Sequence, residues 1–170
     1  MLNNTNTILF AGIIVVVLVA VLYFIIYSRE KKELKKQARP SAAASGLQLQ
    51  AYERLTILAE RIALPNLVTR IPAADLSAKQ LQGLLVDTIK QEFDYNISQQ
   101  IYVSPQAWQA VSNLKEQNIF IINQLAGTLP QEAGGKELSK KILKLLNADT
   151  NASLHPIVLQ ALRFEAKKLM

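Results

Sequence analysis

The sequence predicts an all-α protein with a single N-terminal transmembrane helix followed by a compact bundle of about five helices. Residues 8–27 carry no charged side chain, and a helix of that length spans about 30 Å, the thickness of a bilayer core. After position 47, apolar residues recur with helical spacing, and clusters of proline, glycine and serine separate the periodic segments. The segment with strand propensity, Ile101–Val103, is too short for a sheet of its own.

The segment that follows the predicted span carries a strong positive charge. Six basic residues fall within positions 29–39, against only Glu30 and Glu33. Because basic residues remain on the cytoplasmic side, we expect the N-terminus outside and the C-terminal domain in the cytoplasm. The same cluster could bind anionic lipid headgroups, although orientation alone explains it more simply. The candidate headgroup ligands are Lys31, Lys32, Lys35 and Lys36.

These features divide the chain into four parts. Residues 1–7 form a short extracytoplasmic N-terminus, 8–27 the transmembrane helix, 28–46 a basic juxtamembrane segment and linker, and 47–170 a cytoplasmic helical domain. Arg39-Pro40 stops any continuing helix, and Ser41–Gly46 has the composition of a flexible linker. The remaining 13 basic and 11 acidic residues of the domain nearly balance, which argues against a nucleic-acid-binding face.

Five helices are expected in the domain. The first covers residues 47–64 and ends at Pro65, before a loop over 64–74. The second begins with a capping box, Ser77 with Gln80, and runs to about residue 97. An extended connection over 98–104 leads to the third, central helix, 105–127, which has Ser104 as N-cap before Pro105. The last two cover residues 136–147 and 154–169.

Catalytic and metal-binding patterns are not apparent in the sequence. There is no cysteine, and the single histidine, His155, is best explained as a capping or surface group. Glu92 and Asp94 are two residues apart and point away from each other on a helix. No glycine-rich phosphate loop and no Glu-x-x-His pair occurs. We therefore expect no enzyme activity, no catalytic residue, no cofactor and no metal.

Several short motifs resemble a family of uncharacterised bacterial single-pass membrane proteins with a cytoplasmic helical domain of unknown function. The motifs are Leu49-Gln50-Ala51-Tyr52-Glu53-Arg54-Leu55, Leu81-Gln82, Gln91-Glu92-Phe93 and Ser98-Gln99-Gln100-Ile101-Tyr102-Val103. The resemblance implies a location in the bacterial plasma membrane. It brings no established activity or site.

The function predicted from the sequence is a membrane-anchored cytoplasmic interaction module: a scaffold, adaptor or accessory subunit. We expect membrane lipid as the partner of residues 8–27, a protein as the partner of the domain, and no nucleic acid. Two alternatives stay open, a membrane-surface enzyme with an unrecognised site and an anionic-lipid-binding protein. The candidate partner-binding residues are Tyr52, Arg54, Glu92, Tyr95 and Tyr102.

Overall fold

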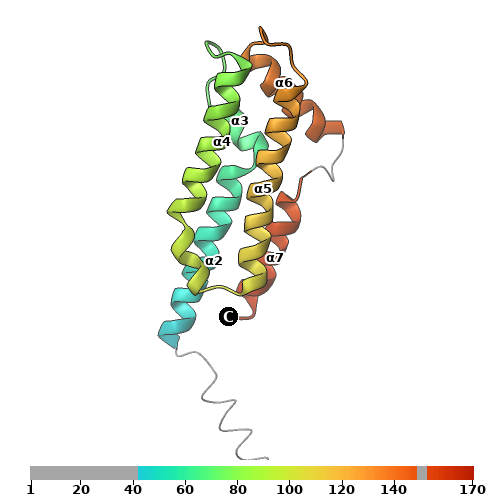
Figure 1. Ribbon diagram of the computed structural model, residues 1–170. Coiled ribbons are helices and arrows are strands. Elements are labelled where there is room, and N and C mark those ends of the chain that lie inside the picture. Colours follow the sequence, from blue (N-terminus) through green and yellow to red (C-terminus); the bar gives the residue numbers. More distant parts are fainter. Residues whose placement is uncertain (1–41, 149–152) are drawn as a thin grey trace, which may run out of the picture. The chain divides into compact units, whose positions relative to one another are not determined.

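The computed structural model describes residues 42–148 and 153–170, which are helical throughout apart from short connections (Figure 1). Residues 44–170 form one compact unit. The helices are α2 (Ala42–Ile62), α3 (Leu64–Arg70), α4 (Ala78–Tyr95), α5 (Pro105–Gly127), α6 (Gly135–Ala148) and α7 (His155–Lys167), with a 3₁₀ helix, η1 (Ile97–Ile101), after α4. The all-helical prediction for the domain is therefore confirmed.

The predicted fold class is nevertheless wrong as a whole. Six α-helices rather than five make up the described residues, and none of these six is long and apolar enough to cross a membrane. The predicted span, residues 8–27, lies outside the described residues, as do the four lysines of the basic segment.

Three local predictions also need correction. Residues 42–46, expected as a flexible linker, begin α2, because the helix propensity of the three alanines outweighs the cost of Gly46. Residues 64–70 form α3 rather than a loop, since Pro65 is tolerated in the first turn of a helix. Residues 98–101, expected in the extended connection over 98–104, belong to η1 (Ile97–Ile101), which contains the bond from the Gln99 amide to the Asn96 carbonyl at 3.0 Å.

Predictions that rest on local capping were accurate. The capping box of α4 is present, with Ser77 Oγ accepting from the Gln80 amide and Gln80 Oε1 accepting from the Ser77 amide. Helix α5 has the predicted bounds, and the Ser104 hydroxyl accepts from the Ala107 amide. Helices α6 and α7 agree with the predicted ranges to within two residues at each end.

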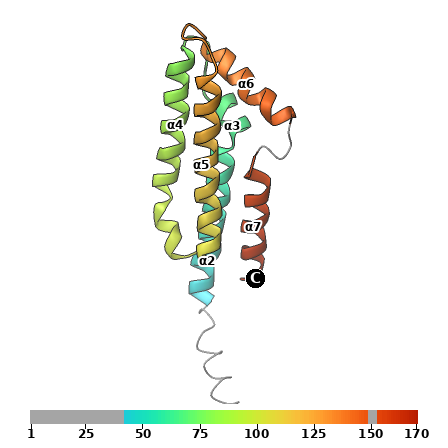
Figure 2. The same ribbon diagram turned by 45° about the vertical axis from the view of Figure 1, so that its right-hand side comes forward.

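Helix α5 lies at the centre of the bundle, as predicted. It packs against α4, α6 and α7, and Figures 1 and 2 show α4 and α7 on opposite sides of it. Buried leucine and isoleucine side chains from all the α-helices fill the space between them. The ring of Trp108 packs on Phe93 of α4, with 4.9 Å between centroids, at the margin of this core.

Helix α2 is bonded to its neighbours through side chains. Its last carbonyls have no partner in a following turn, because Ala63, with φ −56° and ψ 127°, leaves the helical region and breaks the helix. The Glu60 carbonyl accepts from Asn66 Nδ2 at 2.9 Å and the Arg61 carbonyl from Arg70 Nη2 at 3.3 Å. The Ile62 carbonyl accepts from Nδ2 of Asn118, a fully buried residue of α5, at 2.8 Å. The break between α2 and α3 is thus fixed by groups of α3 and α5.

The connections before α4 and α6 pair with each other at one end of the bundle (Figure 1). Ser77 and Gly134 form an antiparallel bridge. Its two hydrogen bonds are reciprocal: the Ala78 amide donates to the Ala133 carbonyl at 2.8 Å, and the Gly135 amide donates to the Leu76 carbonyl at 2.6 Å. The two helix starts are therefore held by one shared contact.

Gly135 is required by this close approach. A Cβ atom at position 135 would lie 2.9 Å from the Ala73 carbonyl oxygen and 3.0 Å from that of Leu76. We expect Gly135→Ala to lower the free energy of unfolding by about 1–3 kcal/mol, since backbone must move to admit the methyl group. Urea denaturation followed by circular dichroism measures the change.

The matched control is Gly83→Ala, in the exposed middle of α4, where an added Cβ meets nothing within 4 Å. This substitution should raise stability by about 0.5–1 kcal/mol, because alanine is the better helix former. Equal effects of the two substitutions would show that the bridge does not constrain position 135.

Candidate functional site

An open groove lies between α2 and α4, and we call it the α2–α4 groove. It encloses about 530 Å³. Its lining residues are Arg54, Ile57, Arg61, Thr88, Gln91, Glu92, Tyr95 and Asn96. A second hollow of about 340 Å³ adjoins it through Ile57 and Arg61 and extends the groove along α2 to Arg70 of α3.

Helical spacing brings these side chains to one surface. Arg54, Ile57 and Arg61 follow the i, i+3, i+7 pattern, which places them on one face of α2. Thr88, Glu92 and Tyr95 follow the i, i+4, i+7 pattern, which places them on one face of α4. The adjacent face of α2, about 100° round the helix, carries the fully buried Leu55, Leu58 and Ile62, so packing of that face fixes the direction of the groove residues.

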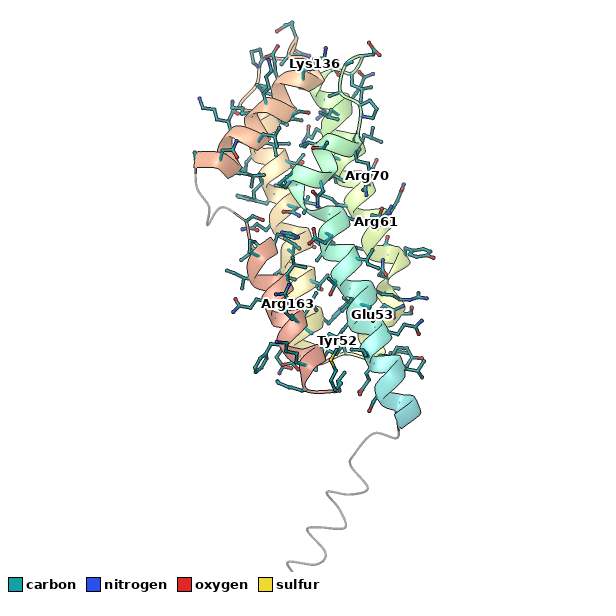
Figure 3. The ribbon with its side chains drawn as sticks, turned by 180° about the vertical axis from the view of Figure 1, so that it is seen from behind. Tyr52, Glu53, Arg61, Arg70, Lys136 and Arg163 are labelled. Atoms are coloured by element: carbon teal, nitrogen blue, oxygen red, sulfur yellow. The ribbon has the colours of Figure 1, made fainter. Side chains whose placement is uncertain are left out.

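An ion pair joins the two walls of the groove. Arg61 binds the Glu92 carboxylate with two hydrogen bonds, from Nε to Oε2 at 2.8 Å and from Nη2 to Oε1. Arg70 Nη2 lies 3.7 Å from the same Oε1 atom, so two guanidinium groups share one carboxylate. Figure 3 marks Arg61 on α2 and Arg70 on α3, one above the other along the same side.

The ion pair matters more for geometry than for stability. The hydrogen bonding of the Arg61 guanidinium to Glu92, and then the negative charge of Glu92, raise the pKa of Arg61 above its ordinary value. A raised pKa stabilises the fold at every pH below the ordinary arginine range, and this contribution is lost only as the pH rises through that range. The Arg61 side chain is 51% exposed, so water screens the pair and limits its contribution to below about 1 kcal/mol. A bidentate contact does, however, fix the orientation of both groups.

Exposed apolar side chains flank this ion pair. Ile57 is 58% exposed and Tyr95 is 79% exposed, one on each wall. Tyrosine and arginine are the residue types that most often dominate protein–protein binding energy. The groove therefore combines anchors for apolar groups with charged groups held in a defined place.

Three of the five candidate partner-binding residues meet in this groove: Arg54, Glu92 and Tyr95. Tyr52 does not join them. It is only 5% exposed, and its hydroxyl accepts a hydrogen bond from the Ser104 amide at 3.1 Å, at the start of α5. Tyr102 follows η1 and does not line the groove.

Several groove residues were missed by sequence reasoning, among them Ile57, Arg61 and Arg70. A signal for the first was available, because Ile57 is a large aliphatic residue outside the apolar stripe of its helix. The positions of Arg61 and Arg70 depend on how α2, α3 and α4 pack, which helical periodicity does not encode.

The acidic and histidine side chains of the described residues do not form a metal site. Within residues 42–148 and 153–170, no group of three or more histidine, aspartate and glutamate side chains could hold a metal ion. His155 begins α7, and its Nε2 atom lies 3.4 Å from Oε2 of Glu60 on α2. The histidine thus sits at a helix start, as expected, and contacts another helix there.

Comparison with known protein families adds one result. A model described as "Family of unknown function (DUF7935)" matches residues 1–169. The chain belongs to this family. No curated protein and no solved structure matches the chain. The predicted resemblance to a family of unknown function is confirmed, while bacterial origin and single-pass topology stay predictions for this DUF7935 member.

The roles of Tyr52 and Tyr95 can be separated by substitution. Tyr52→Phe should lower the free energy of unfolding by about 1 kcal/mol, because the Ser104 amide loses its acceptor. Tyr95→Ala should change it by less than about 0.5 kcal/mol, since the side chain is exposed. Thermal and urea denaturation of both variants provide the measurement. A large loss of stability in Tyr95→Ala would mean that Tyr95 serves the fold rather than the groove surface.

Proposed function

We propose that this protein is a non-enzymatic interaction module, a scaffold, adaptor or accessory subunit, whose α2–α4 groove binds a protein partner. The main support is the pairing of two exposed apolar side chains, Ile57 and Tyr95, across an ion pair that spans the groove. Two rigid helices carry all of these groups, so the surface is formed before a partner arrives, which reduces the entropy cost of binding.

Site-specific photo-cross-linking in the native cells tests this proposal. A photoreactive amino acid replaces Ile57 or Tyr95 in the full-length chain, and a third variant carries it at Phe120. Phe120 is a suitable control because it is 60% exposed but lies on α5, outside the groove. We expect defined protein adducts from the two groove positions and none of the same mass from Phe120.

A second substitution shows whether the groove itself binds. Adding Arg54→Asp to the Tyr95 cross-linking variant should remove most of the adduct. The substitution replaces an exposed positive charge of the groove with a negative one. Either an absence of adducts at both groove positions or the same adducts at Phe120 would overturn the proposal.

A membrane location forms the second part of the proposal. It rests on the sequence of residues 8–27, which contains no charge, and on the six basic residues that follow. The expected bacterial plasma-membrane location, with the C-terminal domain in the cytoplasm, would place the groove at the cytoplasmic surface. Extraction of cell membranes at alkaline pH tests it: the full-length protein should remain in the pellet, and complete release into the supernatant would contradict the location.

A further inference from the structure

The carboxylates of the groove have more partners within the protein than its guanidinium groups have. Three arginines and two glutamates line its two hollows. Both carboxylates already have partners: Glu92 binds Arg61 and lies near Arg70, while Glu60 lies 3.4 Å from Nε2 of His155 and accepts from Asn66 Nδ2 at 3.2 Å. The three arginines outnumber the two glutamates, so the groove residues carry a net positive charge, which favours an acidic partner over a cationic one.

The guanidinium groups still have donors to offer. Arg54 makes no ion pair or side-chain hydrogen bond with any described residue, and it is exposed. Arg61 uses Nε and Nη2 for Glu92, and within the described residues its Nη1 donates no hydrogen bond. Because arginine binds carboxylates with several donors at once, the groove is suited to a partner that carries acidic side chains.

The spacing of these groups matches a helix. Arg54 and Arg61 are seven residues apart, which corresponds to about 10.5 Å along the helix axis, and Ile57 lies between them. Two acidic residues seven apart on a partner helix have the same separation, and an apolar residue between them lies on the same face. Tyr95 provides the opposite wall for that apolar residue.

We infer that the α2–α4 groove binds an acidic amphipathic helix, with carboxylates at Arg54 and Arg61 and an apolar residue between Ile57 and Tyr95. This mode is helix-in-groove recognition, in which anchors at i, i+3 or i+4 and i+7 provide the affinity. The inference rests on the proposed function, that the groove is a protein-binding surface. A free phosphate or a simple carboxylate would leave the two apolar walls without a partner.

Three synthetic peptides of about 20 residues, matched in their apolar stripe and helix propensity, test the inference. They carry Glu, Gln or Lys at two positions seven residues apart. Fluorescence anisotropy against the full-length protein should show that the Glu peptide binds about tenfold more tightly than the Gln peptide and that this preference weakens at high salt. The Lys peptide should bind most weakly.

Charge reversal of the groove provides the specific control. Arg54→Glu should remove most of the preference for the Glu peptide and strengthen binding of the Lys peptide. Arg163→Glu makes the same charge change on α7, where Arg163 is exposed outside the α2–α4 groove, and should leave the order of the peptides unchanged (Figure 3). An equal loss in both variants would mean that net charge alone attracts the peptide.

The outcomes separate this inference from the proposed function. Equal binding of the three peptides would overturn the acidic-helix inference, while cross-linking from Tyr95 would still support a protein-binding groove. Failure of the cross-links would remove the proposed function itself. A last comparison uses vesicles in which half of the lipid is anionic. If the vesicles block cross-linking from position 95 more effectively than the Glu peptide does, the groove contacts a lipid surface, and the acidic-helix inference is wrong.

Discussion

The end of α2 is the constraint on which the rest of the bundle depends. A helix that stops leaves its last carbonyls without partners, and where such a carbonyl is buried, as at Ile62, leaving it unpaired costs about 1–3 kcal/mol. Here the carbonyls of residues 60, 61 and 62 are each taken by a different side chain, from Asn66, Arg70 and Asn118. The first two hold α3 against the end of α2, and the third ties α2 to α5. Arg70 donates its hydrogen bond to the Arg61 carbonyl, and this position also brings its guanidinium group beside Glu92.

The candidate site thus depends on a backbone feature that is not itself part of the site. Arg61 precedes the break by two residues, and Arg70 follows it by one short helix. A continuous helix would carry position 70 about 13 Å beyond position 61. The turn at Ala63 instead allows both arginines to approach one carboxylate of α4. The break therefore converts two distant basic residues into neighbours and creates the extended groove.

The sequence predicts the parts of this structure that are determined locally. Ser77 with Gln80 and Ser104 with Pro105 fix their helix starts through contacts within four residues, and both starts were predicted correctly. Pro65 was interpreted only as a helix stop, although a proline that ends one helix is equally suited to begin the next. Polarity alone singled out Arg54, Glu92 and Tyr95. It could not separate them from Tyr52, whose hydroxyl is buried by a contact with Ser104, far along the chain.

The reciprocal bonds between the connections at Ser77 and Gly134 also bear on the order of folding. These bonds join residues that are distant in sequence, and closing a long loop of flexible chain costs more entropy than forming a short hairpin. Pairing of α4 with α5 shortens that loop, because it brings the start of α4 near the end of α5 before the bridge forms. With α4 and α5 paired, the loop that remains to be closed is short, so the bridge costs little further entropy to form. The bridge holds the start of α4, the helix that provides one wall of the groove, and η1 follows the other end of that helix.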